Sequence, residues 1–342
     1  MSEWSVRKIL DWMRKDLEAK GVDSPRLDAE LMVSAAVGLG RMDLYLDPER
    51  PLSEDELSDI RARFRRRRGR EPMAYILGYR DFYKSRFRVT PDVLIPRGDS
   101  ELLVDVGLRC LAGADAAKVV DLCTGSGCVG ISIAKERLEK GKQTELTLTD
   151  ISPPALEVAR ENAKSLMVEV VCVLGDLFEA LEEDARFDLM TINPPYIAEP
   201  ELETLMPEVA RFEPHLALVS GADGRDALRR ILREAKTYLA PGGSLLVEVG
   251  MGQAPAFASA LTKAGYATTR VHRDLGGIER MVEARVEAEA EEEETRVDVD
   301  EPGGPSDADF AGEQRVELDS PDFGGDDLGD GDNAADPEKS GE

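Results

Sequence analysis

The chain has 342 residues and a formal net charge of −26 at pH 7, a length that allows two domains with a sizeable core. Residues 283–342 hold 23 acidic and 4 basic side chains, so the remainder carries only about −7. This balance argues against a protein that holds nucleic acid by charge, and no run reaches the roughly 18 apolar residues of a membrane span. Because the N-terminus also lacks the apolar core of a signal peptide, we expect a cytoplasmic protein.

The four cysteines form no CxxC pair, and the whole chain has only two histidines to accompany them. A metal site is therefore not expected, and reduced thiols fit a cytosolic protein. The cysteines are Cys110, Cys123, Cys128 and Cys172.

Residues 1–75 are predicted to form a small helical bundle domain, because apolar residues recur at helical spacing and no strand pattern interrupts them. Ser24 is expected to cap the second helix, and Ser53 with Glu56 is expected to form a capping box at the start of the third. The arginine run at 65–68 is interpreted as a solvated helix face, with contact to an acidic partner or RNA as the alternative.

Residues 76–97 are β-rich but broken by glycine and proline, which predicts a β-hairpin linker. Over 98–284, strands alternate with helices, which predicts an α/β domain with a mostly parallel, doubly wound sheet. Its last two apolar runs, 265–274 and 279–286, are expected to pair as an antiparallel edge. Residues 285–342 lack the apolar side chains needed to offset ordering entropy, so they are predicted to be a disordered acidic tail that solubilises or docks weakly. The strands are expected at 118–122, 145–150, 168–176, 187–193 and 244–250, with helices at 129–140, 152–166 and 224–240.

Three glycines, Gly125, Gly127 and Gly130, lie between the first predicted strand and the helix after it. Glycine lets the backbone approach a ligand closely, and a helix N-terminus offers free N–H groups. Asp150 ends the second strand, where an acid accepts hydrogen bonds from ribose hydroxyls. The pattern predicts a site for an adenosine-bearing cofactor, with a dinucleotide and simple strand–helix packing as the alternatives.

Two further segments bear on the choice of cofactor. Asp121 lies where a charged α-amino group would pair with it, and Asp176 and Leu177 lie beside an expected adenine position. An ordinary loop aspartate explains Asp176 equally well. No dehydrogenase requires the tetrapeptide that follows the fourth strand, at residues 193–196.

That tetrapeptide, Asn193-Pro194-Pro195-Tyr196, suits methyl transfer to a planar NH2 group. Such a nitrogen is a poor nucleophile because its lone pair is delocalised. The side-chain oxygen of Asn193 and the backbone oxygen of Pro194 can accept both of its hydrogens and so turn the lone pair toward a methyl donor. The prolines stiffen these acceptors, and Tyr196 is expected to lie against the flat group. The alternative is a turn that merely ends the strand.

The combined pattern resembles the class I S-adenosylmethionine-dependent methyltransferases that act on planar NH2 groups, and within that class the release factor glutamine methyltransferases. The resemblance covers residues 5–283. It implies a Rossmann-like seven-stranded class I methyltransferase sheet behind a helical substrate-binding domain. It rests on "REPMAYILGYRDFY", "LIPRGDSELLV", "DLCTGSGCVGISIA", "TDISPPALEVARENA", "FDLMTINPPYI", "EPHLALVSGADG" and "LAPGGSLLVEVGMGQ".

The resemblance also implies a reaction and its residues. S-adenosylmethionine would methylate nitrogen N5 of the glutamine in the Gly-Gly-Gln motif of class 1 peptide chain release factors, leaving S-adenosylhomocysteine. Asn193, Pro194 and Tyr196 are the expected catalytic residues, and together with Pro195 they are expected to hold the glutamine. The expected cofactor contacts are Asp121, Cys123, Thr124, Gly125, Ser126, Gly127, Asp150, Asp176, Leu177 and Asn193.

Three positions depart from the family pattern: Cys123 replaces a usual glycine, Gly98 a usual proline and Leu177 a frequent aromatic residue. Gly98 is expected to loosen the "IPR" loop, and Leu177 to stack less well on adenine. Six other residues are left open between a role at the site and a structural one, with the structural role favoured for His215 because the reaction needs no general base. They are Arg97, Asp99, Glu101, Glu213, His215 and Glu248.

Other functions compete with this interpretation. A ribosomal-protein glutamine methyltransferase shares the same tetrapeptide, although "LIPRGDSE" favours the release-factor branch. Adenine-N6 methylation in nucleic acid predicts a basic target-recognition region, whereas the chain has one short arginine run. A catalytically idle binding module conflicts with the intact glycine loop and the intact 193–196 segment. We expect a monomer that binds no nucleic acid stably.

Overall fold

The computed structural model describes residues 4–288, which belong to one compact unit, Met1–Glu291. Apart from residues 285–288, the predicted disordered tail lies outside the described residues. Within the described part, no helix is both long and apolar enough to span a membrane.

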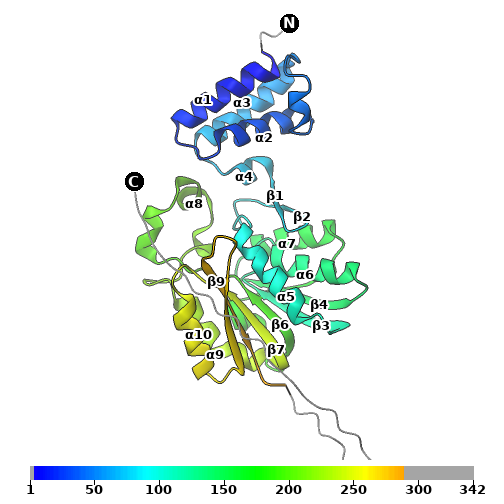
Figure 1. Cartoon of the computed structure of the whole chain (residues 1–342), viewed down its shortest axis with the longest axis vertical. Helices are drawn as coiled ribbons and strands as arrows, with labels where there is room; N and C mark the ends of the chain where they lie inside the picture. The colour runs from blue at the N-terminus through cyan, green and yellow to red at the C-terminus, as the bar shows by residue number, and fades with distance from the viewer. Residues whose placement is uncertain (1–3, 289–342) are drawn as a thin grey trace, which may run out of the picture. The chain divides into compact units, whose positions relative to one another are not determined.

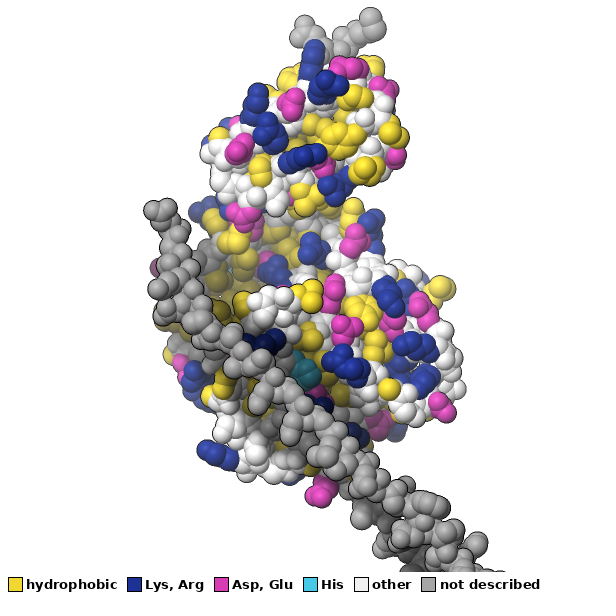
Figure 2. Space-filling view, in the orientation of Figure 1, with side chains coloured by type: hydrophobic (Ala, Val, Ile, Leu, Met, Phe, Trp, Pro, Cys, Tyr) yellow, Lys and Arg dark blue, Asp and Glu magenta, His cyan; other side chains and the backbone are white. Residues whose placement is uncertain are grey.

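Three helices make up the N-terminal segment: α1 (Val6–Ala19), α2 (Pro25–Val37) and α3 (Glu54–Arg68) (Figure 1). They bury a common apolar core, and the 3-10 turn η1 (Asp43–Tyr45) adds a side chain to it. Figure 2 shows basic and acidic side chains interspersed over the visible face of this segment. The largest fully buried core residues are Met13, Leu17, Met32, Leu44, Leu52, Leu57 and Ile60.

The start of α3 has the predicted capping box. The Ser53 hydroxyl accepts a hydrogen bond from the Glu56 N–H at 3.3 Å, and the Glu56 carboxylate accepts one from the Ser53 N–H at 2.8 Å. Ser24 and Pro25 do open α2 as predicted, with Ser24 at the N-cap position, but the Ser24 side chain makes no capping hydrogen bond. Proline suits the first helical turn because it has no N–H to satisfy there and its φ is already helical.

We expect Ser53→Ala to lower the free energy of unfolding by about 1 kcal/mol, because it removes the acceptor for one orphan N–H of α3. Ser24→Ala is the matched control, since this serine is also exposed and also precedes a helix but caps nothing. Its unfolding free energy should stay within about 0.5 kcal/mol of the parent. Urea denaturation measures both, and equal losses would contradict the assignment of the cap.

A short helix and a hairpin connect the helical segment to the sheet. The helix α4 (Met73–Leu77) was not predicted; it is followed by the antiparallel pair β1 (Tyr79–Phe82) and β2 (Ser85–Arg88). Tyr75 anchors this connection, because its buried hydroxyl donates to the backbone oxygen of Val93 at 2.7 Å.

The central sheet has seven strands in the order β5-β4-β3-β6-β7-β9-β8. Five neighbouring strands are parallel, while β9 is antiparallel to both β7 and β8. The seven-stranded, mostly parallel sheet is therefore confirmed, and its last two strands do pair antiparallel. The strands are β3 (Ala116–Leu122), β4 (Gln143–Asp150), β5 (Val171–Leu174), β6 (Phe187–Ile192), β7 (Leu239–Glu248), β8 (Thr268–Arg273) and β9 (Glu279–Arg285).

Helices cover both faces of this sheet (Figure 1). Alternate residues of β3 show why: Val119 packs into the core under α5, α6 and α7, whereas Val120 packs into the core under α9 and α10. The predicted helix at 224–240 is shorter, because β7 already begins at Leu239. The helices are α5 (Glu101–Cys110), α6 (Cys128–Glu139), α7 (Pro153–Ser165), α8 (Pro207–Phe212), α9 (Asp226–Glu234) and α10 (Ala254–Lys263). The 3-10 turns are η2 (Gly98–Ser100), η3 (Leu177–Ala180), η4 (Glu199–Thr204), η5 (His215–Ala217) and η6 (Ala235–Tyr238).

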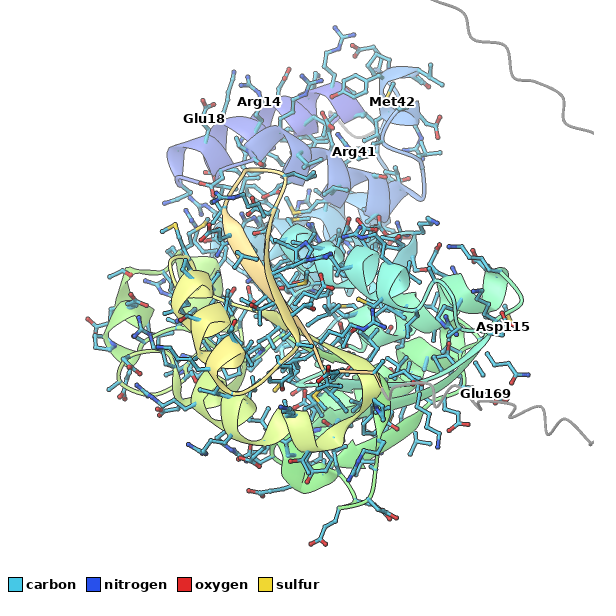
Figure 3. The ribbon with its side chains drawn as sticks, turned by 60° about the horizontal axis from the view of Figure 1, so that its bottom comes forward. Arg14, Glu18, Arg41, Met42, Asp115 and Glu169 are labelled. Carbon is cyan, nitrogen blue, oxygen red and sulfur yellow. The ribbon has the colours of Figure 1, made fainter. Side chains whose placement is uncertain are left out.

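The two edges of the parallel strands differ. Asp115 precedes β3 and Glu169 precedes β5, and Figure 3 shows both side chains on the same side of the molecule. The carboxyl ends of these strands, which carry the glycine loop and the 193–196 segment, lie at the other edge. Ligands of open α/β sheets bind at that carboxyl edge.

Candidate active site

A cavity of about 340 Å³ opens at the carboxyl ends of β3, β4 and β6, a volume within the range of small-molecule sites. The structure brings nine of the predicted site residues together on its wall: Asp121, Cys123, Thr124, Gly125, Asp150, Asp176, Leu177, Asn193 and Pro195. Four predicted residues are not on the wall: Ser126, Gly127, Pro194 and Tyr196.

The three glycines of the loop have different roles. Gly125 has φ +54° and open space where a Cβ would stand, so its backbone faces the cavity uncovered. Gly127 has φ +79° and a Cβ there would lie 2.5 Å from Ile131, while a Cβ on Gly130 would lie 2.8 Å from Leu148. The first glycine thus permits close approach of a ligand, the second leaves room for Ile131 of α6 and Ala159 of α7, and the third permits close packing of α6 on the sheet.

Two carboxylates flank the loop, a buried one on Asp121 and a half-buried one on Asp150. Asp121 accepts hydrogen bonds from the Thr124 hydroxyl at 2.6 Å, the Thr191 hydroxyl at 2.7 Å and the Gly130 N–H at 3.2 Å. Burial raises the pKa of Asp121 to about 6 against the effect of these bonds. A carboxylate has about four acceptor positions, so one stays available to a ligand.

Asp150 ends β4 and has the same kind of support. It accepts hydrogen bonds from the N–H groups of Gly125 and Ser152, both at 2.9 Å. Burial raises its pKa, while these backbone bonds favour the charged form. The carboxylate therefore ties the glycine loop to the end of β4 and holds an acceptor on the cavity wall.

The Asp176 carboxylate forms an ion pair with an arginine that the sequence analysis did not identify. The Arg230 guanidinium on α9 donates to the Asp176 carboxylate at 2.5 Å and to its backbone oxygen at 3.0 Å. Arg230 also lines the cavity, and its signal in the sequence is only that of one more charged residue on a helix. The neighbouring Leu177 is buried, with φ +52°.

Cys123 stands in a conformation that suits glycine. Its φ is +55°, in the left-handed region, where a Cβ costs roughly 1–2 kcal/mol. Burial raises the pKa of its thiol, so the side chain is a neutral part of the wall. The departure from the family's usual glycine therefore carries backbone strain at the cavity.

We expect Cys123→Gly to raise the free energy of unfolding by about 1 kcal/mol, because it removes the strain of a left-handed side chain. Cys123→Ala is the matched control, since alanine keeps the Cβ and hence the strain while also losing the thiol. Thermal unfolding of the two variants distinguishes these effects, and a Gly variant no more stable than the Ala variant would contradict the interpretation.

Asn193 follows directly after β6 and lies on the cavity wall. Its side-chain NH2 donates to the Ser100 hydroxyl at 3.2 Å, whereas its Oδ1 is buried without a hydrogen-bond partner. A buried acceptor that no protein group satisfies costs free energy and calls for an explanation. A donor on a bound molecule would supply the missing partner.

Gln253 holds the segment after Asn193 in place and was not singled out from the sequence. Its side-chain NH2 donates to the backbone oxygens of Tyr196 at 3.3 Å and Gly224 at 3.2 Å, and its Oε1 accepts from the Gly250 N–H at 2.9 Å. Burial raises the pKa of Tyr196 to about 12, so the phenol is neutral. The only signal for Gln253 was its place within the "VGMGQ" stretch of the resemblance.

Of the residues left open between a role at the site and a structural one, some line the cavity and others do not. Arg97 lines the cavity and pairs with the buried Glu213 at 2.5 Å, whereas Glu101 accepts from the Tyr83 N–H at 2.8 Å and braces the hairpin. His215 is exposed, contacts the Ala210 oxygen at 3.2 Å and is not on the cavity wall. The Asp99 carboxylate lies 3.5 Å from Arg280.

The solvated-face interpretation of the arginine run is wrong for Arg67. Its guanidinium is buried and pairs with Asp28 on α2 at 2.6 Å and with Glu208 on α8 at 2.9 Å. Arg70 donates to the same Glu208 at 2.7 Å. Burial opposes ionisation of Glu208, but Arg70 and Arg67 hold its pKa below the usual range. This cluster links the helical segment to α8, which follows the 193–196 segment.

Residues 4–288 contain no group of three or more histidine, cysteine or acidic side chains arranged to hold a metal ion. The four cysteines, all within that range, are unpaired. The wall of the cavity is made of carboxylates, hydroxyl groups, backbone groups, the Asn193 amide, apolar side chains and the two arginines Arg97 and Arg230.

This strand order, with a glycine loop after β3, an acid ending β4 and Asn-Pro-Pro-Tyr after β6, defines a class I methyltransferase. Two family models match the chain: PrmC N-terminal domain over residues 8–78 and Methyltransferase small domain over residues 100–209. The chain belongs to the release factor glutamine methyltransferase family, as the resemblance implied.

Two relatives carry that conclusion. The release factor glutamine methyltransferase of Geobacter sulfurreducens is 42% identical over 283 residues, which is 83% of this chain and 97% of the relative. That of Bordetella pertussis is 42% identical over 260 residues, or 75% of this chain and 93% of the relative. A solved release factor-specific protein-(glutamine-N5) methyltransferase from Alicyclobacillus acidocaldarius is 28% identical, with a TM-score of 0.35, over 59% of this chain and 99% of that one.

Proposed function

We propose that the protein transfers a methyl group from S-adenosylmethionine to the side-chain amide nitrogen N5 of the glutamine in the Gly-Gly-Gln motif of class 1 release factors. The observation that carries the proposal is the buried, unpartnered Oδ1 of Asn193 on the cavity wall. Membership of the release factor glutamine methyltransferase family supports the choice of substrate over ribosomal protein and over adenine.

The cavity fits the proposed cofactor. The uncovered backbone at Gly125 and the adjacent carboxylate of Asp150 suit a ribose with two hydroxyl donors. Asp121 keeps an acceptor position for an ammonium group, and Leu177 offers an apolar surface to a base. When bound, S-adenosylmethionine supplies an electrophilic methyl group, and S-adenosylhomocysteine is the product that leaves.

The residues of the chain then have defined tasks. The Oδ1 of Asn193 accepts one hydrogen of the glutamine amide, and the backbone oxygen of Pro194 accepts the other. Held in this way, the amide nitrogen directs its lone pair away from its own carbonyl group, which restores nucleophilicity. Tyr196 is the expected apolar support of the planar amide. The nitrogen forms one N–C bond, and its surplus proton passes to water.

We also propose how the chain divides. Residues 1–75 form the helical domain that contacts the release factor, 76–97 the hairpin linker and 98–284 the methyltransferase domain, followed by the acidic tail at 285–342. The separate apolar core of the helices supports the first boundary. Because the proposed substrate is a release factor, the proposed site of the reaction is the cytoplasm. We propose that the protein acts as a monomer.

The proposal is tested with purified release factor and labelled S-adenosylmethionine. We expect label to enter the wild-type release factor and not a variant whose Gly-Gly-Gln glutamine is changed to alanine. Ribosomal protein and DNA containing adenine serve as the competing substrates. Label retained on the alanine variant, or transferred to a competing substrate instead, would exclude the proposed target.

A further inference from the structure

Hydrogen bonds join three side chains from distant parts of the chain at the cavity. Asn193 donates from its NH2 to the Ser100 hydroxyl at 3.2 Å, and that hydroxyl donates to the Glu248 carboxylate at 2.6 Å. Ser100 and Glu248 are both buried, at 2% and 4% exposure. Ser100 and Asn193 line the cavity, whereas Glu248, at the end of β7, does not.

The chemistry of these groups fixes which atom donates and which accepts in each of the two hydrogen bonds. An ionised carboxylate only accepts hydrogen bonds, so Glu248 takes the single hydroxyl hydrogen of Ser100. The Ser100 oxygen can then only accept, and it is satisfied by the NH2 side of Asn193. The Oδ1 of Asn193 is left without a protein partner, as the structure shows.

A neutral Glu248 would no longer fix the donor and acceptor roles in these two hydrogen bonds. A carboxylic acid can donate its own hydrogen to Ser100, and the serine hydroxyl is then free to donate to Asn193. The Asn193 amide would satisfy that donor by turning its Oδ1 toward Ser100 and its NH2 toward the ligand. A site that must accept two hydrogens would then present a donor.

We propose that Ser100 and Glu248 are positioning residues whose fixed hydrogen-bond direction keeps the acceptor oxygen of Asn193 available to the substrate amide. This inference rests on the proposed function, because it assigns the free oxygen to an amide hydrogen of the substrate. Neither residue is assigned a chemical step. Their effect passes through Asn193.

The surroundings of Glu248 make its charge state sensitive to pH. Burial raises its pKa to about 7, and Asp99 acts in the same direction. The hydroxyl of Ser100 and the cations of Arg280 and Arg97 lower it. Tyr196 and Cys128 also interact electrostatically with Glu248, but burial raises their pKa values and both are neutral near pH 7. Glu248 is thus ionised above about pH 7 and neutral below it.

We expect kcat for release factor methylation to rise with pH through about 7 in the wild type. Glu248→Gln should lower the plateau of kcat about 10-fold and flatten this profile, because its amide can turn either its oxygen or its NH2 toward Ser100 and so fixes no hydrogen-bond direction at any pH. Ser100→Ala should also lower kcat and flatten the pH profile, because it removes the hydroxyl that joins Glu248 to Asn193. Ser100→Thr keeps the hydroxyl and should retain most of the rate. KM and the cofactor affinity from calorimetry should change less than about 3-fold.

Ser132→Ala is the matched control, since Ser132 is another buried serine, on α6, whose hydroxyl has no hydrogen-bond partner. It should leave kcat and its pH profile unchanged. Thermal unfolding verifies that each variant is folded. For a variant that does not fold, the wild-type measurements decide: the side-chain NH2 signals of Asn193 in nuclear magnetic resonance should shift with pH as Glu248 titrates.

The outcomes separate the two proposals. A wild-type protein that methylates no release factor refutes the proposed function. A wild-type protein that methylates release factor, but with a flat profile and with Asn193 signals insensitive to pH, overturns the positioning role alone. Full activity of folded Ser100→Ala protein, or a folded Glu248→Gln protein that keeps the wild-type pH profile, would overturn it as well.

Discussion

Asn193→Ala is expected to reduce the turnover of release factor methylation by roughly 100-fold or more, the scale of losing a group that acts on the transition state. The substitution removes the unpartnered oxygen that we assign to an amide hydrogen of the substrate. Cofactor affinity should stay within a few fold of the wild-type value, because the carboxylates and backbone groups of the cavity remain. Single-turnover kinetics and calorimetry measure the two effects, and unchanged turnover would refute the role of Asn193.

Asn162→Ala is the matched control for this prediction. Asn162 is a buried residue whose amide oxygen and both amide hydrogens have partners: it accepts from the Arg88 N–H at 2.7 Å and donates to the oxygens of Arg88 at 3.0 Å and Ser126 at 2.9 Å. Its loss should lower the free energy of unfolding by about 2–3 kcal/mol, because backbone groups are left unpaired. Asn193→Ala should cost less than about 1 kcal/mol, because it removes an unsatisfied acceptor. A functional asparagine and a structural one are thereby distinguished.

Arg67→Met is expected to lower the free energy of unfolding by about 3–5 kcal/mol, the usual cost of breaking a buried ion pair from one side. The substitution keeps the apolar stem but leaves Asp28 without its cation and Glu208 with only Arg70. Burial already raises the pKa of Asp28, so its carboxylate would become protonated more readily in the variant. Urea denaturation measures the loss.

Arg68→Met is the control from the same arginine run. Its guanidinium is half exposed and pairs with Asp16 at 2.9 Å, so its removal should change the free energy of unfolding by less than about 1 kcal/mol. Adding Asp28→Asn and Glu208→Gln to Arg67→Met should recover part of the stability, because no buried charge then lacks a partner. Equal effects of the two arginine variants would show that the buried cluster is not stabilising.

Local patterns predicted the elements of the sheet well, for a physical reason. The apolar runs in the second halves of β3 and β6 are buried on both faces, and each is followed directly by the loop that ends the strand. The glycine loop was recognisable because positive φ at Gly125 and Gly127 and close packing at Gly130 leave no other residue type unstrained. These constraints act within a few residues and are therefore visible in the sequence.

Long-range contacts were not predictable in this way. Four successive arginines point in different directions around a helix, and Arg67 is distinguished by its contacts with Asp28 and Glu208, 39 and 141 positions away. Ser100 and Glu248 are 148 positions apart, so no spacing rule connects them. The helix α5 was missed because its apolar residues follow a proline-rich loop without a capping signal, and tertiary packing on the sheet decides its conformation.

The antiparallel direction of β9 has a practical consequence for experiments on this protein. Because β9 runs antiparallel to β7, its last residue, Arg285, pairs with Ser244, the first residue of β7 that pairs with β9. Two residues further on, the backbone oxygen of Glu287 accepts a hydrogen bond from the Gly242 N–H at 2.9 Å. The backbone thus leaves the described region at the edge opposite the cavity. A fluorophore or surface tether attached at this exit would have its anchor point remote from the mouth through which the glutamine must enter.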